Sequence, residues 1–263
     1  MAPRVVASAF TALALCLISG AGCGGSDNPV PDLSGSRVVG FRAPEASGDD
    51  AARTVRLEGR IFGAPGTVPR PGVVLVHTLP GDQRAWFDLA ETLADEGALV
   101  LTFDLRGVCP GGDGGCSAGT QDPASAPTDL LAAIAFLRDE GASEVSVVGA
   151  GIGGTAALIA ASTLESGADV PAIVTLSAPP QSGDLVVEDA MLQTQTAKLL
   201  IAGTGDEAAG EAAQELYGIA TPPKRVEIVP SDGQGTELLE SARGAEVERQ
   251  IVLWLQQHAS LPT

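Results

Sequence analysis

The chain has 263 residues, of which 33 are Asp or Glu, 15 are Lys or Arg and 2 are His, so its formal net charge is −18 at pH 7. This acidity excludes nucleic acid as an expected partner, because phosphate backbones are bound by basic surfaces. Once a targeting segment is set aside, about 210 residues remain, which is enough for one domain with a sizeable core.

The amino terminus has the pattern of a secretion signal. Arg4 gives it a short positive region, and the apolar run over 5–18 is shorter than a membrane span, which needs roughly 20 residues. Small residues then lead into Cys23, an arrangement that resembles a bacterial lipoprotein signal. The resemblance implies that Cys23 becomes the lipidated first residue of a protein anchored to the membrane in the bacterial cell envelope. A signal peptide cleaved elsewhere, or an uncleaved anchor, is the alternative; without lipidation the exported protein would be periplasmic or extracellular.

The sequence divides into three regions. Residues 1–22 are assigned to the signal peptide, 23–52 to a flexible tether and 53–263 to one folded domain. The tether assignment depends on a composition rich in Ser, Pro, Gly and Asp without a hydrophobic period. No internal repeat divides the folded region.

Apolar patterns along the folded region predict strands that alternate with helices. Residues 54–62 alternate as a half-buried strand does, and 37–42 are expected to pair with them as a hairpin. The predicted buried strands are 72–77, 98–103, 144–149, 171–176, 198–202 and 225–229. The predicted helices carry Trp86 to Leu93, Leu130 to Leu137 after Pro127, 153–165, 207–217 and Val247 to Leu255. This alternation predicts an α/β fold with a doubly wound, mostly parallel sheet and helices on both faces.

Two cysteines lie in a Gly- and Pro-rich loop between a strand and a helix. In an oxidising compartment, Cys109 and Cys116 are expected to form a local disulfide. A metal site would need further ligands, and the chain has only His77 and His258 as histidines, so we expect no metal.

The stretch Val145 to Ala157 reads as a strand, a glycine turn and the start of a helix. Gly149, Gly151 and Gly154 fit G-x-G-x-x-G, a pattern that holds dinucleotide phosphates on backbone N–H groups. That pattern normally has an acidic residue at the end of the next strand, but here this strand ends in Ser177. The turn also follows at least three strands instead of the first one. Dinucleotide binding is therefore the weaker alternative, and we expect no cofactor.

The ends of the strands, taken in order, resemble the α/β-hydrolase superfamily over residues 54–258. With only about twenty residues between strands 171–176 and 198–202, the chain resembles the capless, dienelactone-hydrolase-like branch. The resemblance places Gly151 on the nucleophile elbow, Asp206 at the acid position and Gln234 at the histidine position. It places His77, Thr78 and Ile152 in the oxyanion region of a ligand pocket, and Asp104, Arg106 and Gly107 in a D-x-R-G segment.

The side chains at these positions do not support acyl transfer. Gly151 offers no nucleophile, and the amide of Gln234 cannot accept a proton near neutral pH. Only Asp206 has the expected chemistry. The sequence thus predicts a non-catalytic binding or interaction module, a pseudoenzyme, with a small molecule or a protein as its ligand. An active esterase or peptidase with a displaced catalytic set is the main alternative.

The remaining polar residues are expected to serve structure. His77 is expected to form hydrogen bonds at a strand terminus, and His258 to face solvent or the end of the last helix. Ser177 lacks an elbow pattern, and Asp232 is expected to be a turn residue. Asp104 and Arg106 are expected to pair with each other at the strand end.

Overall fold

The computed structural model describes residues 33–45, 53–63, 69–110, 115–164 and 170–263. These residues belong to one compact unit, Pro31–Thr263. The predicted signal peptide, Cys23 and the tether up to residue 32 lie outside the described residues. None of the helices in the described ranges is long and apolar enough to cross a membrane.

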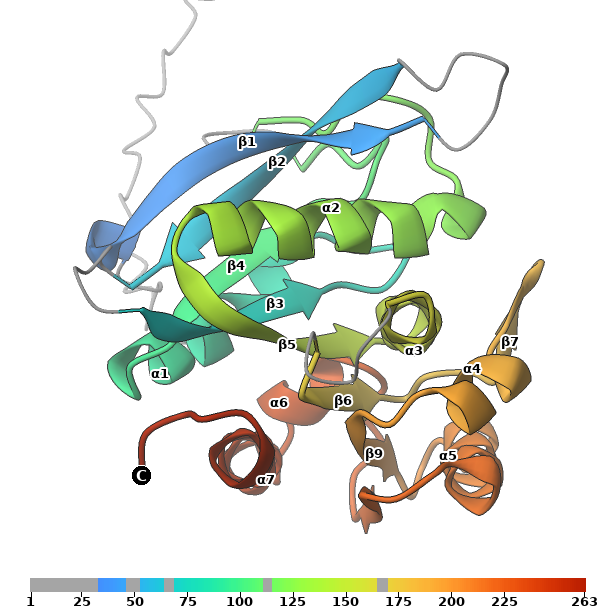
Figure 1. The fold of residues 1–263 in the computed structure, drawn as a ribbon. Coiled ribbons are helices and arrows are strands. Elements are labelled where there is room, and N and C mark those ends of the chain that lie inside the picture. Colours follow the sequence, from blue (N-terminus) through green and yellow to red (C-terminus); the bar gives the residue numbers. More distant parts are fainter. Residues whose placement is uncertain (1–32, 46–52, 64–68, 111–114, 165–169) are drawn as a thin grey trace, which may run out of the picture. The chain divides into compact units, whose positions relative to one another are not determined.

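A twisted sheet forms the centre of this unit (Figure 1). Within the described residues its eight strands lie in the order β1-β2-β4-β3-β5-β6-β9-β10. Strand β2 is antiparallel to β1 and to β4, and the other neighbours are parallel. The strands are β1 (Ser36–Pro44), β2 (Thr54–Phe62), β3 (Arg70–Val76), β4 (Leu99–Phe103), β5 (Ala142–Ala150), β6 (Ala172–Leu176), β9 (Ala197–Gly203) and β10 (Lys224–Val229).

Helices cover both faces of the sheet, which explains why the central strands are continuous apolar runs. All residues of β4, β6 and β9 are buried, as parallel strands between two helical layers require. One layer consists of α2 (Ala126–Asp139), α3 (Ile152–Ser162), α4 (Glu188–Gln193) and α5 (Glu207–Ile219), and the other of α1 (Phe87–Asp95), α6 (Glu237–Glu240) and α7 (Gly244–His258). The predicted α/β fold with a doubly wound, mostly parallel sheet is confirmed.

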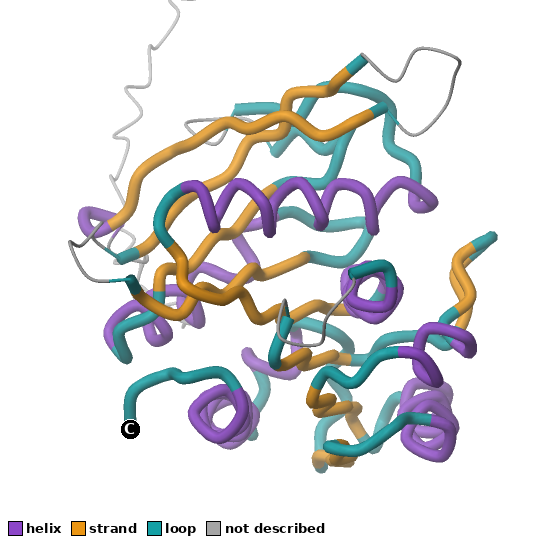
Figure 2. Tube along the Cα trace, in the orientation of Figure 1, coloured by secondary structure: helices purple, strands orange, loops and turns teal. Residues whose placement is uncertain are grey.

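One prediction about the chain's organisation needs correction, and one segment contains elements that the sequence analysis does not predict. The region assigned to a tether, 23–52, contains β1, which pairs with β2 along its whole length from Ser36 to Pro44. The folded unit therefore begins before residue 53. In addition, a short hairpin, β7 (Gln181–Ser182) and β8 (Leu185–Val186), and helix α4 lie between β6 and β9; the hairpin projects from the main sheet next to α4 (Figure 2).

A buried lysine, Lys198, lies near the start of β9 and connects this strand to the residues before it and to the loop before β10. The ammonium group of Lys198 donates hydrogen bonds to the carbonyl oxygens of Thr196 (2.7 Å), Thr194 (3.1 Å) and Thr221 (3.2 Å). It also lies 3.2 Å from the hydroxyl of Thr221. Burial, with a smaller contribution from Lys224, lowers the pKa of Lys198 to about 8. Four oxygens thus replace the water that a lysine normally keeps.

Candidate functional site

Gly151 forms a sharp turn between β5 and α3. Its backbone angles are φ +50° and ψ −121°, and α3 begins at the next residue, Ile152. A positive φ of this kind is strained for residues with a side chain and costs glycine little. The Gly151 N–H donates to the carbonyl of Leu176 at the end of β6 (2.8 Å), and its own carbonyl accepts from Gly154 and Thr155. The backbone therefore has the strand–turn–helix form of a nucleophile elbow.

The neighbouring glycines let α3 pack closely on the sheet. A Cβ atom at Gly149 would lie 2.5 Å from the carbonyl carbon of Gly153, and one at Gly153 would lie 2.7 Å from the carbonyl oxygen of His77. A Cβ atom at Gly154 would lie 2.8 Å from the Cβ atom of Ala178. Close helix–sheet packing accounts for the glycine pattern, so the pattern no longer needs a dinucleotide to explain it.

The side chain of Thr78 lies over the elbow. A Cβ atom added at Gly151 would lie 2.9 Å from the Cβ atom of Thr78 and closer still to its Oγ1 atom. The Thr78 side chain is half-buried and follows the end of β3. It therefore occupies space that a side chain at position 151 would need.

His77 is buried beside Thr78 and makes two hydrogen bonds. Its Nε2 atom accepts from the N–H of Leu105 (3.0 Å), and its Nδ1 atom lies 2.7 Å from the Thr78 carbonyl, to which it donates in the matching tautomer. Burial lowers the pKa of His77. The predicted hydrogen-bonding role at a strand terminus is confirmed, and both ring nitrogens are engaged within the protein.

Asp206 and Gln234, which the resemblance places at the acid and histidine positions, make contacts that differ from those of a catalytic triad. Asp206 follows β9, and its Oδ1 atom accepts from the N–H of Ala209 (3.1 Å), which caps helix α5. Gln234 is exposed in the loop after β10, and its backbone N–H donates to the carboxylate of Glu237 (3.2 Å). The next residue, Gly235, donates its N–H to the hydroxyl of Ser177 (3.0 Å).

Ser177 has an unusual backbone for a residue with a side chain. Its φ is +52°, and it directly follows β6, the strand next to the elbow strand β5. The sequence contains no signal for this, because Ser177 lacks the flanking pattern of an elbow. Strain at a strand end next to a site is a reason to consider function, which makes Ser177 a rival candidate for the nucleophile.

Asp104 and Arg106 do not pair with each other, which corrects the prediction. The carboxylate of Asp104 accepts from the N–H and the side-chain amide of Gln83 (both 2.8 Å). Arg106 instead binds Asp129 of α2, with Nη2 2.5 Å from Oδ1. The chain turns at Arg106 and Gly107 as it leaves the sheet, and this turn directs the guanidinium towards α2.

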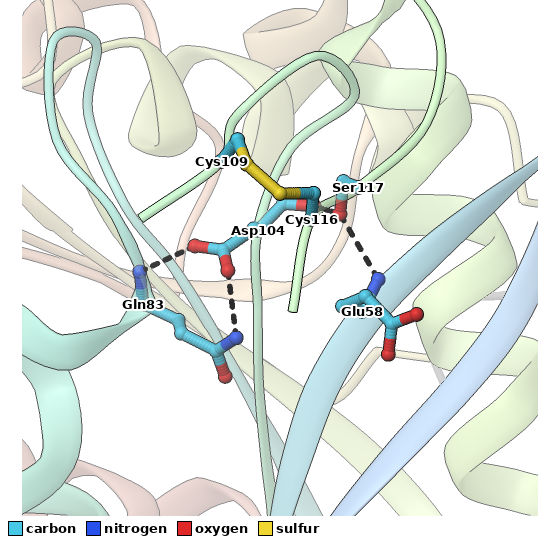
Figure 3. Close-up of a disulfide and its surroundings, with 6 residues drawn as sticks. All are labelled: Glu58, Gln83, Asp104, Cys109, Cys116 and Ser117. Carbon is cyan, nitrogen blue, oxygen red and sulfur yellow. Dashed lines mark hydrogen bonds between the residues drawn. A yellow bond between two sulfur atoms is a disulfide. The ribbon is translucent and has the colours of Figure 1, made fainter. Parts of the chain in front are cut away.

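The predicted disulfide between Cys109 and Cys116 is confirmed (Figure 3). Ser117, the residue after Cys116, contacts both β2 and the residue that follows β4. The hydroxyl of Ser117 donates to the carbonyl of Asp104 (2.6 Å) and accepts from the N–H of Glu58 in β2 (2.9 Å). The disulfide thus holds a loop that joins the end of β4 to β2.

His258 and Asp232 lie where their sequence positions predict, with different surroundings. His258 lies at the end of α7, one of its two predicted places; its ring lies against that of Trp254, with centroids 4.2 Å apart and planes tilted by 51°, and its Nε2 atom is buried. Burial lowers its pKa. Asp232 is exposed, and its Cα atom would lie 2.7 Å from a Cβ atom at Gly205. In the described ranges no group of three or more His, Cys, Asp or Glu side chains is placed to hold a metal ion.

Comparison with known proteins agrees with this arrangement. The sequence profile of a family described as alpha/beta hydrolase fold matches residues 71–229. An esterase of Pyrococcus furiosus has a TM-score of 0.68 and 19% identity, covering 85% of this chain and 90% of that chain. A dienelactone hydrolase from Anabaena variabilis has a TM-score of 0.65 and 20% identity, covering 86% of this chain and 99% of that chain.

A sequence relative gives a more local likeness. A lipoamidase of Enterococcus faecalis is 30% identical over 125 residues, which are 43% of this chain. The match spans only 17% of that protein's length. The two solved structures are similar in fold, and the lipoamidase is similar in one segment.

Proposed function

Because this chain belongs to the α/β-hydrolase-fold family, we propose that it is a catalytically silent member of it. It acts as a binding or interaction module that is exported and held at the bacterial cell envelope by a lipid on Cys23. Its ligand is a small molecule or a protein. The elbow is the main observation in support of a loss of catalysis. Its backbone has the form of a hydrolase nucleophile elbow, but the residue at its centre, Gly151, has no side chain.

Acyl transfer on this scaffold needs a nucleophile, a base that takes its proton and an acid that orients the base. Gly151 supplies no nucleophile. Of the two histidines in the chain, His77 is buried with both ring nitrogens engaged, and His258 ends α7. Gln234 cannot act as a base, and Asp206 caps α5. Each component of the reaction is thus missing or used elsewhere.

Ser177 supports the rival function, an active esterase or peptidase with a displaced catalytic set. Its strained backbone and its place next to the elbow strand resemble the setting of a nucleophile. Its hydroxyl, however, accepts a hydrogen bond from the N–H of Gly235. Neither histidine accepts a hydrogen bond from this hydroxyl in the described residues: both ring nitrogens of His77 are engaged elsewhere, and His258 ends α7 against Trp254.

Turnover separates the two functions. The mature wild-type protein is tested on short p-nitrophenyl esters and with a fluorophosphonate probe, beside Ser177→Ala. We expect neither turnover nor labelling in either protein above a heat-denatured control. Wild-type turnover that disappears in Ser177→Ala would overturn the proposed function and identify the displaced nucleophile.

A further inference from the structure

We propose that Thr78 closes the nucleophile position of the elbow, so that the native fold admits no side chain at position 151 while Thr78 is present. The inference rests on the proposed function. It makes Thr78 a third residue that prevents catalysis, in addition to Gly151 at the elbow and Gln234 at the base position. It predicts that returning a serine and a histidine to their positions would not rebuild the site.

The geometry leaves little room for an alternative arrangement of Thr78. A Cβ atom at position 151 would meet both Oγ1 and, at 2.9 Å, Cβ of Thr78. Rotation about χ1 would move Oγ1 away but would leave Cβ in place. A separation below 3.0 Å between carbon atoms lies well inside their contact distance of about 3.5–4.0 Å. A change of rotamer alone therefore cannot relieve the clash.

The segment that carries Thr78 is held through His77. The Thr78 carbonyl oxygen lies 2.7 Å from Nδ1 of His77, and Nε2 of His77 accepts from the N–H of Leu105 (3.0 Å). Helix α3 runs close to the same segment, because even a Cβ atom at Gly153 would lie only 2.7 Å from the His77 carbonyl oxygen. A movement of the segment away from the elbow would therefore strain or break the hydrogen bond between His77 and Leu105.

A double-mutant cycle in thermal stability tests the proposal. Its members are Gly151→Ala, Thr78→Gly and the combination, and Gly183→Ala is the matched control. Gly183 has φ +58°, close to the +50° of Gly151, but no atom lies within 4 Å of a Cβ atom placed there. The control thus measures the cost of a side chain at positive φ without a clash, for which we expect a fall in Tm of about 2–8 °C.

In the Thr78 background, Gly151→Ala is expected to lower Tm by at least about 2 °C more than Gly183→Ala does, because the clash adds to the strain. In the Thr78→Gly background, the same change is expected to cost no more than Gly183→Ala. An equal cost in both backgrounds would overturn the proposal. If Thr78→Gly does not fold, Thr78→Ala replaces it; that variant removes Oγ1 but keeps Cβ, so an intermediate cost is expected, and an unchanged cost overturns the proposal.

This cycle measures no turnover. An additive cycle would therefore reject Thr78 as the closing residue and leave the proposed function intact. Ester turnover by the wild type would reject the proposed function whatever the cycle shows.

Discussion

The side chain of Asp104 is fully buried. Burial, opposed in part by the two hydrogen bonds from Gln83, raises the pKa of Asp104 from 3.8 to about 6. Between these pH values the folded protein holds its proton more tightly than the unfolded chain does. The contribution of Asp104 to the free energy of unfolding therefore falls as the pH rises from about 4 to about 6, and the full cost of the buried charge remains above that range.

Asp104→Asn is expected to remove this pH dependence. The side-chain oxygen of an asparagine can still accept from the Gln83 N–H. In the wild type the Thr102 hydroxyl donates to the Gln83 side-chain oxygen; after a flip of the Gln83 amide, its NH₂ group can donate to the Thr102 hydroxyl instead. Relative to the wild type, the variant should become more stable by about 2 kcal/mol between pH 4.5 and pH 7. Urea unfolding at both pH values measures this change.

Gln83→Leu is the opposing control. It removes a hydrogen bond that favours the carboxylate, so it should destabilise the protein more at pH 7 than at pH 4.5. A stability difference between Asp104→Asn and wild type that does not vary with pH would contradict the assigned cause.

Residue roles were harder to predict from sequence than residue positions. The sequence places Gly151, Asp206 and Gln234 at the ends of β5, β9 and β10, where the structure has them. It did not identify Thr78 as the residue over the elbow, because no local pattern connects positions 73 residues apart. It also paired Asp104 with Arg106 by proximity in sequence, whereas their partners Gln83 and Asp129 come from a preceding 3-10 helix and from α2.

At the level of elements, the loop after β4 is held by a disulfide and by hydrogen bonds to its neighbours. The Ser117 N–H donates to the Val108 carbonyl (3.0 Å), and the Ala118 N–H donates to the carbonyl of Arg56 in β2 (2.7 Å). Cys109 and Cys116 are exposed and seven residues apart. The cross-link restricts the unfolded chain, and the hydrogen bonds of Ser117 and Ala118 hold the loop after β4 against β2.

Removal of this cross-link is expected to cost about 2–3 kcal/mol, which corresponds to a fall in Tm of roughly 5–10 °C. The wild type should show the fall on addition of dithiothreitol. Cys109→Ser/Cys116→Ser should start at the lower Tm and not respond to the reductant. If the reduced wild type had the same Tm as the oxidised protein, the hydrogen bonds of the loop alone would be enough to stabilise it.

Long elements were predictable and short ones were not. Every strand of the main sheet was anticipated, because five to nine residues are enough to show an apolar run or an alternation. Strands β7 and β8 have two residues each and α4 has six, so none of them is long enough for its apolar pattern to repeat a second time. Strand β1 was recognised as the partner of β2, but the boundary of the tether was placed after it.

For the whole molecule, the net charge of −18 bears on how it is held at a membrane. An acidic protein gains no attraction from anionic lipid head groups, so its charge would not hold it at a membrane, and the proposed lipid on Cys23 would have to do so. We expect the wild type, produced in a bacterial host, to sediment with membranes and to remain there during high-salt washing.

Cys23→Ser should move the protein from the membrane fraction to the soluble exported fraction. Cys109→Ser/Cys116→Ser serves as the control for loss of a cysteine and should stay with the membranes. Persistence of Cys23→Ser in the membrane fraction would instead favour an uncleaved apolar anchor.

The oxygens around Lys198 form the kind of coordination shell that a potassium ion would have. Backbone carbonyls and a threonine hydroxyl surround the cation at 2.7–3.2 Å, and the chain itself provides the positive charge. Because the cation is covalently attached, this corner of the fold does not depend on the ionic composition of its surroundings.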